Sequence, residues 1–472
     1  MKITSTILTL DTFSELIPNF IKKIYMQKNK SWYLIFLICT FLLACTGKKN
    51  EFKDKGSLPK VVIKDEFLVK QLHLASDQLD SAIIEDLFSP PVASRVYLYP
   101  YLATYYCVTE EDSKFDLNLE LENRNKILTD EEVSKVIAIY SFYAVAKELV
   151  YTSSSLNMGE KTFENNLLKL GWTNQLLDNA KEKSRAITNT IISKMNNDGY
   201  KISRTREIFE PSTSDGNWKP TPPDYRNALE PHWSNLLAIS LDSNNQFRPV
   251  EPPVYNLEKK SKFREELDEV RYIVDSLQKN DYRFKSAKFW DCNPFVPLHT
   301  GHITVAEKKL TPGGHWISIA KNAMQKLNLD FSETSKIYAL LSIGIYDSFI
   351  SCWEAKYFYN YVRPITVIQK NFDENWTIAL YTPNFPEYPS GHSVVSGAAS
   401  TILTDLIGDN YEFIDSSEMI FGMPARTFNS FFEARDEAAL SRLYGGIHFR
   451  SAIENGVEQG NIIGLHVLNK FN

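Results

Sequence analysis

Lysine and arginine stand seven residues apart in the first of three segments, late in the chain, that could bind an oxyanion. Lys356 lies in a long apolar stretch, and Arg363 is followed by Pro364. Seven residues make close to two turns of an α-helix, so both cations are expected on nearly the same face. The proline disfavours helical geometry at Arg363, which predicts a helix break there and turns the guanidinium toward the ammonium. Two buried cations require an anion, although a solvated basic stripe would have the same spacing.

The second segment is a turn that opens a helix of small residues, and it reads Ser390-Gly391-His392. The start of a helix exposes backbone N–H groups and the positive end of the helix dipole, which together favour an oxyanion. Glycine lets a ligand approach the backbone closely, serine adds a hydroxyl donor, and histidine carries a proton with a pKa of about 6.5. The alternative is that Ser390 only caps the helix and that His392 lies on its surface.

The third segment contains Arg442 and His448 on either side of the pair Gly445-Gly446. The glycines end one helix and let the chain turn before the last helix begins. A guanidinium offers a planar fork that suits a tetrahedral anion, and His448 can give a lone pair to phosphorus or to a metal. A simple turn between helices with a packed histidine is the alternative. Each segment thus supplies a different part of one oxyanion site.

Taken in this order, the three segments resemble the motifs of the superfamily that vanadium-dependent haloperoxidases share with type 2 phosphatidic acid phosphatases. The motifs are Lys-x6-Arg-Pro, Pro-Ser-Gly-His and Ser-Arg-x5-His, within residues 356–448. The resemblance implies an all-α fold, a helical bundle of this superfamily's type. It also implies a vanadate cofactor, whose place phosphate can take, and the residues that would hold its oxygens are Lys356, Arg363, Ser390, Gly391 and Arg442. His448 would bind the central atom, while His392 would act as acid and base with help from Lys356.

Two enzymatic activities fit a site of this kind, and the resemblance favours the first. A haloperoxidase would use hydrogen peroxide and a halide as partners and release hypohalous acid, with vanadium as the Lewis acid. Trp353 and Phe385 resemble aromatic positions of chloroperoxidase-type and bacterial iodoperoxidase-type sites, where an aromatic wall would exclude water and contact the halide. Plain core packing is the alternative for both side chains. Neither the halide preference nor the organic acceptor follows from the sequence.

An acid phosphatase is the second activity, with His448 as the nucleophile and His392 as the acid that protonates the leaving alcohol. Many phosphatases of the superfamily place an acid four residues after the second histidine, where this chain has Ala452. An orienting carboxylate is therefore expected to be missing, unless Glu454, Ser451 or a backbone carbonyl takes its part. A third hypothesis is a non-catalytic lipoprotein that binds an anion.

Helical periodicity dominates the rest of the chain, and few segments look like strands. The helices that it predicts span residues 131–150, 176–195, 255–277, 334–359 and 452–468. A proline-rich connector at 218–225 cannot continue a helix. It separates an N-terminal helical half, 59–217, from a C-terminal half, 218–472, that carries the site. A second irregular stretch is expected from Trp290 to Trp316, and both halves are expected to pack into one helical body.

The first 45 residues are expected to be a signal rather than part of the fold. After Met26, which is favoured as the natural start, two lysines precede an apolar run that is too short for a bilayer span of about 20 residues. The run ends in Leu-Leu-Ala-Cys45, which resembles the bacterial lipobox and implies a lipid on Cys45; an ordinary signal peptide or a short anchor helix is the alternative. Residues 46–58 form a polar tether. The bacterial protein is thus expected to be exported and attached to a membrane only through its lipid, on the periplasmic or cell-surface side.

Composition and charge exclude other classes of protein. The chain has 472 residues, 43% of them hydrophobic, and 52 basic against 58 acidic residues give a net charge of −6. This balance provides no long-range attraction to nucleic acid, so no such partner is expected. The cysteines beyond the signal are Cys107, Cys292 and Cys352. An odd and widely spaced trio is no disulfide framework.

A metal site built from His299, His302 and His315 is not favoured by the sequence. We expect no nearby cysteine or glutamate to complete it, and we expect these histidines in loops rather than on one helix face. Surface or loop-bracing histidines are therefore the prediction.

Overall fold

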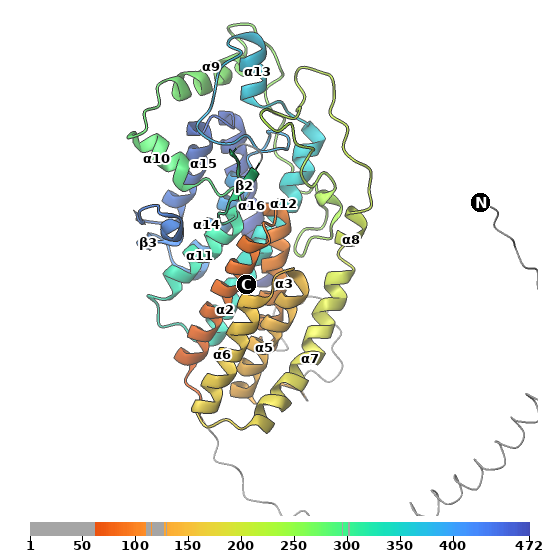
Figure 1. Cartoon of the computed structure of the whole chain (residues 1–472), viewed down its shortest axis with the longest axis vertical. Coiled ribbons are helices and arrows are strands. Elements are labelled where there is room, and N and C mark those ends of the chain that lie inside the picture. Colours follow the sequence, from red (N-terminus) through yellow and green to blue (C-terminus); the bar gives the residue numbers. More distant parts are fainter. Residues whose placement is uncertain (1–61, 110–114, 116–126, 129, 295, 301–302) are drawn as a thin grey trace, which may run out of the picture. The chain divides into compact units, whose positions relative to one another are not determined.

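The structure of the protein, a computed structural model, describes residues 62–472 except 110–114, 116–126, 129, 295 and 301–302. These residues form an all-α fold, as predicted (Figure 1). The helices before residue 218 are α2 (Asp65–Glu85), α3 (Pro90–Val108), α5 (Glu131–Leu149), α6 (Ser154–Lys169), α7 (Asn174–Asn196) and the short α8 (Tyr200–Ser203). The helices after it are α9 (Lys262–Asp275), α10 (Tyr282–Phe289), α11 (Pro312–Met324), α12 (Phe331–Tyr359), α13 (Pro364–Asn371), α14 (Gly391–Ile407), α15 (Phe431–Tyr444) and α16 (Arg450–Phe471).

Strands in the described part of the chain are confined to two antiparallel hairpins. The first pairs β1 (Val296–Thr300) with β2 (Ile303–Glu307), and the second pairs β3 (Phe413–Asp415) with β4 (Arg426–Phe428). Two 3-10 turns, η2 (Trp233–Asn235) and η3 (Ser417–Phe421), complete the elements.

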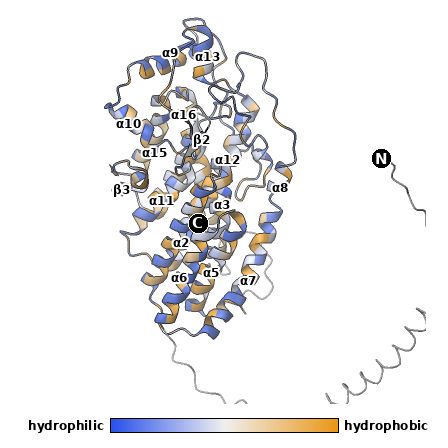
Figure 2. Cartoon of the chain, viewed as in Figure 1, coloured by the Kyte–Doolittle hydropathy of each residue, from blue (hydrophilic) through white to orange (hydrophobic). Residues whose placement is uncertain are grey.

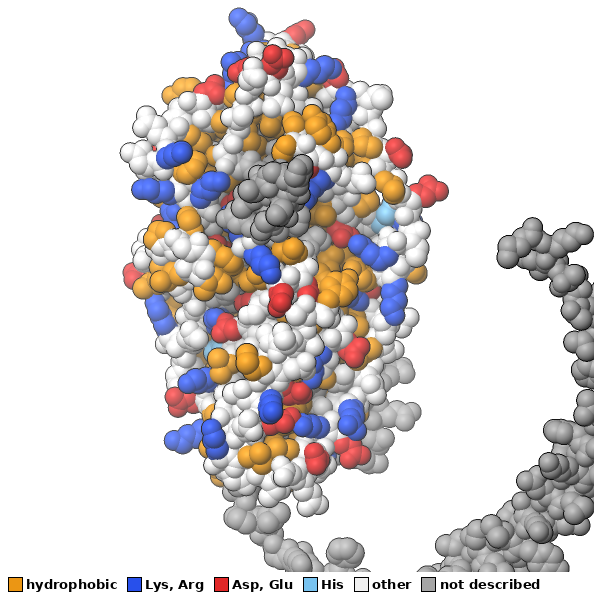
Figure 3. Space-filling model, in the orientation of Figure 1, with side chains coloured by type: hydrophobic (Ala, Val, Ile, Leu, Met, Phe, Trp, Pro, Cys, Tyr) orange, Lys and Arg blue, Asp and Glu red, His pale blue; other side chains and the backbone are white. Residues whose placement is uncertain are grey.

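The predicted signal, its lipobox Cys45 and the tether up to residue 58 lie outside the described residues. Within the described ranges, no helix combines the length and the apolar character needed to cross a membrane. In Figure 3 the basic and acidic side chains are interspersed over the face in view, with hydrophobic side chains scattered between them.

The helices of the N-terminal half cover one another with amphipathic faces. Helix α3 packs against α5, α5 against α7, and α2 against α6. In α7 the buried residues recur every three or four positions, as in Leu177, Ala180 and Ser184, so one face is apolar and the other polar (Figure 2). Helix α3 is buried almost throughout.

Helix α12 joins the two halves of the chain through one continuous hydrophobic core, because it packs against α3, α14 and α16. Its start is fixed by a capping box, in which Asp330 accepts from the backbone of Glu333 and Glu333 returns the bond. The ring of Tyr338 on α12 stacks on Tyr101 of α3 at a centroid distance of 4.6 Å. The domain boundary at residue 218 remains a prediction.

Helices α14 and α16 approach so closely that two glycines are required between them. A Cβ atom at Gly397 would stand 2.6 Å from the carbonyl oxygen of Val457, and one at Gly460 would stand 2.1 Å from that of Val394. Real Cβ atoms do not come this near to backbone. The close approach brings the starts of both helices together, and Ser390 N donates to Ala452 O at 3.0 Å.

Two predicted boundaries are wrong. The helix expected at 255–277 begins only at Lys262, because the Ser261 side chain caps it by accepting from a backbone N–H. Residues 312–316 were expected to be irregular, but they form the start of α11, with Pro312 at its first turn and Thr311 as the cap. His315 is therefore a helical residue, and it is fully buried rather than exposed in a loop.

Candidate active site

Lys356 and Arg363 converge because the chain breaks between them, not because they share one helix face. Helix α12 ends at Tyr359, and Asn360 closes it in the left-handed conformation with φ of 46°. Arg363 then has extended backbone, with φ of −81° and ψ of 146°, directly before Pro364 starts α13. The predicted helix break before Pro364 is therefore present, but the expectation that both cations lie on nearly the same helix face is wrong.

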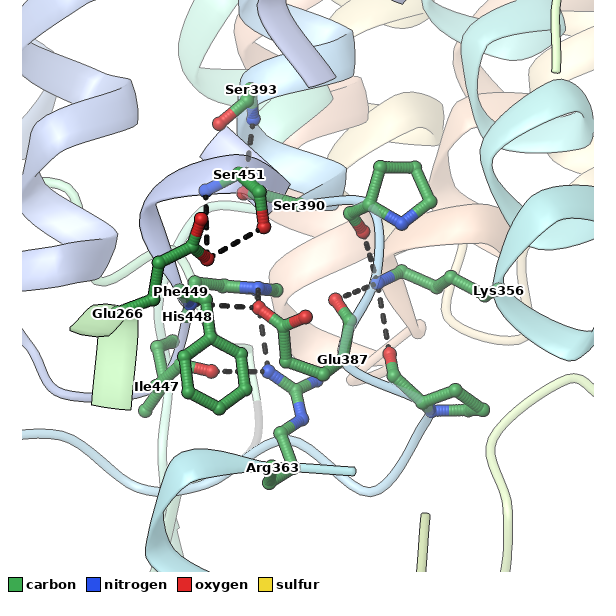
Figure 4. Close-up of polar contacts among 12 residues, drawn as sticks. Glu266, Lys356, Arg363, Glu387, Ser390, Ser393, Ile447, His448, Phe449 and Ser451 are labelled. Atoms are coloured by element: carbon green, nitrogen blue, oxygen red, sulfur yellow. Dashed lines mark hydrogen bonds and ion pairs between the residues drawn. The ribbon is translucent and has the colours of Figure 1, made fainter. Parts of the chain in front are cut away.

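Lys356 is fully buried, and backbone carbonyls surround its ammonium. Nζ donates to the carbonyl oxygens of Pro386 and Glu387, each at 3.0 Å, and to that of Pro389 (Figure 4). Burial, with a smaller contribution from the positive charge of Arg363, lowers the pKa of Lys356 to about 7. The side chain therefore titrates near neutral pH and can hold or release a proton there.

Arg363 is also fully buried and is held mostly by carbonyl groups. Its Nε and Nη2 donate to Phe385 O at 3.1 and 3.0 Å, and Nη1 donates to Ile447 O at 2.8 Å. Nη1 also lies 3.3 Å from Nε2 of His448. Burial lowers the pKa of Arg363 to about 10, so the guanidinium keeps its charge at neutral pH.

His448 is oriented by a carboxylate that the sequence analysis did not assign. The Nδ1 atom of His448 lies 2.8 Å from Oε1 of Glu387, and the same oxygen accepts Phe449 N–H at 2.9 Å (Figure 4). An oxygen that already accepts a backbone N–H favours a proton on Nδ1 of the imidazole. The contact from Arg363 to Nε2 favours the same tautomer. The lone pair of His448 is therefore on Nε2, as a ligand role requires.

Burial shifts the pKa values of this pair in opposite directions. It raises the pKa of Glu387 to about 8, against the opposing charges of Arg363 and Lys356. Burial, followed by the charge of Arg363, holds the pKa of His448 well below its ordinary value, so the imidazole is neutral.

The expected absence of an orienting carboxylate is thus wrong: Glu387 supplies it from the loop before α14. Neither predicted substitute does so, because Ser451 bonds to Glu266 and Glu454 pairs with Arg450. The sequence could have indicated Glu387 as the orienting carboxylate, because it is the one acidic residue between Phe385 and His392.

The turn before α14 places Ser390 and Gly391 beside the two cations. Ser390 is fully buried and caps α14, with Oγ accepting from Ser393 N at 3.4 Å. The alternative interpretation of Ser390 as a helix cap is therefore correct for this contact. A Cβ atom at Gly391 would meet carbon atoms of Trp353 and Lys356 at 3.5 and 3.9 Å, which are ordinary contacts. The protein itself has room for a side chain here, so the bare backbone leaves space for a ligand.

His392 and Arg442 face each other across the same region. Nη1 of Arg442 donates to Trp290 O and lies 3.2 Å from Nε2 of His392. Because a guanidinium can only donate, this contact leaves the lone pair of His392 on Nε2. Burial, followed by the charge of Arg442, holds the pKa of His392 well below its usual value, so it is a neutral proton acceptor. The alternative of a histidine on the helix surface is wrong, since the half-buried ring lines the cavity described below.

A cavity of about 310 Å³ opens between these groups. Its lining includes His392, His448, Arg442, Gly391, Trp353 and Phe385. Lys356, Arg363 and Ser390 lie directly behind this lining rather than in it. The rings of Trp353 and Phe385 lie 4.9 Å apart, and Nζ of Lys356 lies 4.9 Å from the Phe385 centroid. The aromatic wall therefore borders both the cavity and the ammonium.

The residues around the cavity fit a tetrahedral oxyanion. Three buried cations, Lys356, Arg363 and Arg442, form no ion pair with any carboxylate of the described residues. Nε of Arg442 is buried without a hydrogen-bond partner in the described chain. Donors without anionic partners, an open glycine backbone and the lone pair of His448 on Nε2 are the features that vanadate or phosphate requires.

Several known proteins resemble this chain in sequence and fold. The family model described as the second helical-bundle domain of VCPO matches residues 336–472. A solved structure described as the first bacterial vanadium-dependent iodoperoxidase is similar with a TM-score of 0.78 and 39% identity, covering 86% of this chain and 97% of that one. The chain belongs to the vanadium-dependent haloperoxidase family. Membership confirms the predicted family and the kind of enzyme, and vanadate is the cofactor of that family.

More distant haloperoxidase structures share the fold. The holo and apo forms of a bacterial vanadium-dependent chloroperoxidase have TM-scores of 0.64 and 0.63 at 16% and 15% identity. They cover 82% and 81% of this chain, and 93% and 94% of their own chains. No curated protein matches the chain. The roles of the individual site residues stay predictions, although the structure brings all of the motif residues to one place.

Proposed function

We propose that this haloperoxidase-family protein oxidises iodide with hydrogen peroxide to hypoiodous acid, with vanadate bound in the cavity. The observation that supports it most is the 39% identity, over 86% of the chain, to a protein described as an iodoperoxidase. The site adds chemical support, because an aromatic wall of Trp353 and Phe385 borders the cavity and suits a large, polarisable anion.

The residues that would hold vanadate are Lys356, Arg363, Ser390, Gly391, Arg442 and His448. Bound vanadate would supply a Lewis acid that activates hydrogen peroxide, and the vanadium would not change its oxidation state. The chain's own groups provide charge, direction and protons. Buried cations are effective here because the surrounding dielectric is low and their positions are fixed before the anion arrives.

Two imidazoles divide the proton and ligand work. Glu387 holds the proton of His448 on Nδ1, which keeps Nε2 free as a ligand atom. His392 is neutral and has its lone pair on Nε2, the atom that Arg442 contacts, so it can take a proton from peroxide once the guanidinium binds the anion instead. Lys356, with its pKa of about 7, can polarise an oxygen as ammonium or exchange a proton at neutral pH.

An acid phosphatase remains the second candidate, and one observation favours it. The pair of Glu387 and His448 has the arrangement of an oriented histidine nucleophile, with a carboxylate on the far nitrogen. The sequence argument against a phosphatase relied on a missing carboxylate, and Glu387 removes that argument.

The deciding experiment compares the two activities on one preparation. Protein reconstituted with vanadate is given hydrogen peroxide with iodide, bromide or chloride, and an indicator dye reports halogenation. Vanadate-free protein is given a simple phosphomonoester. Turnover with iodide supports the proposal. No turnover with any halide refutes it, turnover with bromide but not iodide refutes the halide assignment, and phosphomonoester hydrolysis alone favours the phosphatase.

We also propose that the protein is exported and anchored through lipid on Cys45. The support is the sequence Leu-Leu-Ala-Cys45 after a short apolar run. In a bacterial host, the full chain should incorporate labelled fatty acid and partition with membranes. The Cys45→Ser variant should do neither, and labelling of that variant would refute the anchor.

A further inference from the structure

A second cluster of ligand-type side chains lies beside the cavity and takes no part in the proposed reaction. Cys292 follows α10 and lines the cavity wall, while His315 lies on α11. Asp415 ends β3, and Glu418 lies on η3. All four side chains are buried, with exposures between 0 and 2%.

The distances within this cluster match the spacing of ligands around one metal ion. Nδ1 of His315 lies 3.2 Å from Sγ of Cys292 and 3.6 Å from Oε1 of Glu418. The three ligand atoms all lie within 4.8 Å of one another. A tetrahedral zinc ion with Zn–S of about 2.3 Å and Zn–N of about 2.0–2.1 Å separates its ligands by distances of this order.

An unpartnered oxygen points to a ligand at the cluster. Glu418 is 2% exposed, and its Oε1 has no hydrogen-bond partner in the described chain, although it is the oxygen that faces His315. A buried carboxylate oxygen without a donor is costly, and a bound cation would satisfy it.

The imidazole is already oriented for coordination. Nε2 of His315 lies 2.7 Å from Oδ2 of Asp415, and Asp415 is itself fixed by Ser417, whose N–H and hydroxyl donate to Oδ1. A histidine that donates one ring N–H to a carboxylate keeps the other nitrogen as the ligand atom, which is the usual arrangement behind a metal-bound histidine. Nδ1 is that free atom here, and it faces both Cys292 and Glu418.

We propose that Cys292, His315 and Glu418 bind a divalent transition-metal ion of the zinc class, separate from the vanadate site. A thiolate, an imidazole and a carboxylate form a donor set that suits zinc and disfavours magnesium or calcium. Binding replaces the thiol proton of Cys292 and the proton on Nδ1 of His315, whose pKa is raised by Asp415, and both protons leave to solvent. One thiolate and one carboxylate then neutralise the dication. Because Cys292 lines the cavity, the ion can enter from there and solvent can complete its coordination.

The neighbouring charges are compatible with a dication. Asp415 adds negative charge behind His315, and the nearby Asp291 and Lys309 form an ion pair at 3.2 Å. Arg442 of the oxyanion site interacts electrostatically with Cys292, so the thiolate that binding creates there would also favour the charge of that guanidinium.

The test uses the full-length, vanadate-loaded protein and zinc alone as the first probe. After incubation with excess zinc and gel filtration, elemental analysis should find one zinc per chain. Cobalt should replace it and give the near-ultraviolet absorption of a cobalt–thiolate bond. Cys107→Ser, which changes another buried thiol, is the matched control and should bind metal like the wild type.

Two variants keep the proposal falsifiable. Cys292→Ser should abolish the cobalt–thiolate absorption and weaken zinc binding at least tenfold. Glu418→Gln, which preserves shape if the serine variant fails to fold, should also weaken zinc binding at least tenfold, with circular dichroism confirming a folded chain. No zinc in the wild type, or equal zinc in either folded variant, would overturn the site.

Discussion

Glu387 gives the sharpest test of how the site is organised, because its carboxylate touches His448 and not the cavity. Glu387→Ala removes the acceptor for two buried N–H groups, those of His448 Nδ1 and Phe449. Leaving such a group unpaired costs about 1–3 kcal/mol, and loss of an outer-shell partner lowers metal affinity by about 10- to 100-fold. We therefore expect the alanine variant to bind vanadate about 100-fold more weakly than the wild type, at the upper end of that range.

Glu387→Gln separates the charge of the carboxylate from its hydrogen bonds. The amide oxygen can still accept from both N–H groups, so the tautomer of His448 is kept while the charge is lost. A hydrogen bond with a charged partner is worth about 1.5–3 kcal/mol against about 0.5–1.5 for a neutral one. At a pH above 8, where Glu387 is ionised, this difference of about 1–1.5 kcal/mol corresponds to a roughly five- to tenfold weaker vanadate affinity.

Vanadate binding should be measured by calorimetry and by titrating the recovery of iodide oxidation, with a thermal melt of each variant. Glu454→Gln is the control, since Glu454 is mostly exposed and pairs with Arg450. A merely structural role for Glu387 would lower the melting temperature and leave the vanadate Kd unchanged. Wild-type vanadate affinity in the alanine variant would refute the assignment of Glu387 as a positioning residue.

Further variants address the cations, the open backbone and the imidazoles. The pKa of Lys356 is lower in the folded protein than in the unfolded chain, so the free energy of unfolding of vanadate-free protein should increase as pH rises from about 7 toward 10.5 in chemical denaturation. Lys356→Met should remove this pH dependence and also the thermal stabilisation by vanadate. Gly391→Ala should keep the melting temperature but lower vanadate affinity at least tenfold by calorimetry, since its Cβ would meet only ordinary contacts. His448→Ala should lose vanadate on dialysis, whereas His392→Ala should retain it and lose iodide oxidation; normal retention in the former would make the ligand assignment wrong.

The motif residues could be found from the sequence because an oxyanion demands cations, helix-start amides and imidazoles in short local patterns. Five helices were predicted from periodicity, because burial of one face repeats every three or four residues. The end of α12 at Tyr359 agrees with the predicted helix at 334–359, but the path of the chain from there to Arg363 could not be read in this way. Asn360 adopts the left-handed conformation and ends the helix before the proline can, so Lys356 and Arg363 meet through a loop rather than along a helix.

Contacts between distant segments set the limit of sequence reasoning at this site. Glu387 and His448 are 61 residues apart, and His315 and Asp415 are 100 residues apart. Neither contact can be predicted from the spacing of nearby residues, because each depends on how α11, α14 and α16 pack. Burial then decides the chemistry, since the same carboxylate that would be ionised in water has its pKa raised to about 8 beside a neutral imidazole. The ionisation of Glu387 is therefore coupled to the arrival of an anion among the three cations.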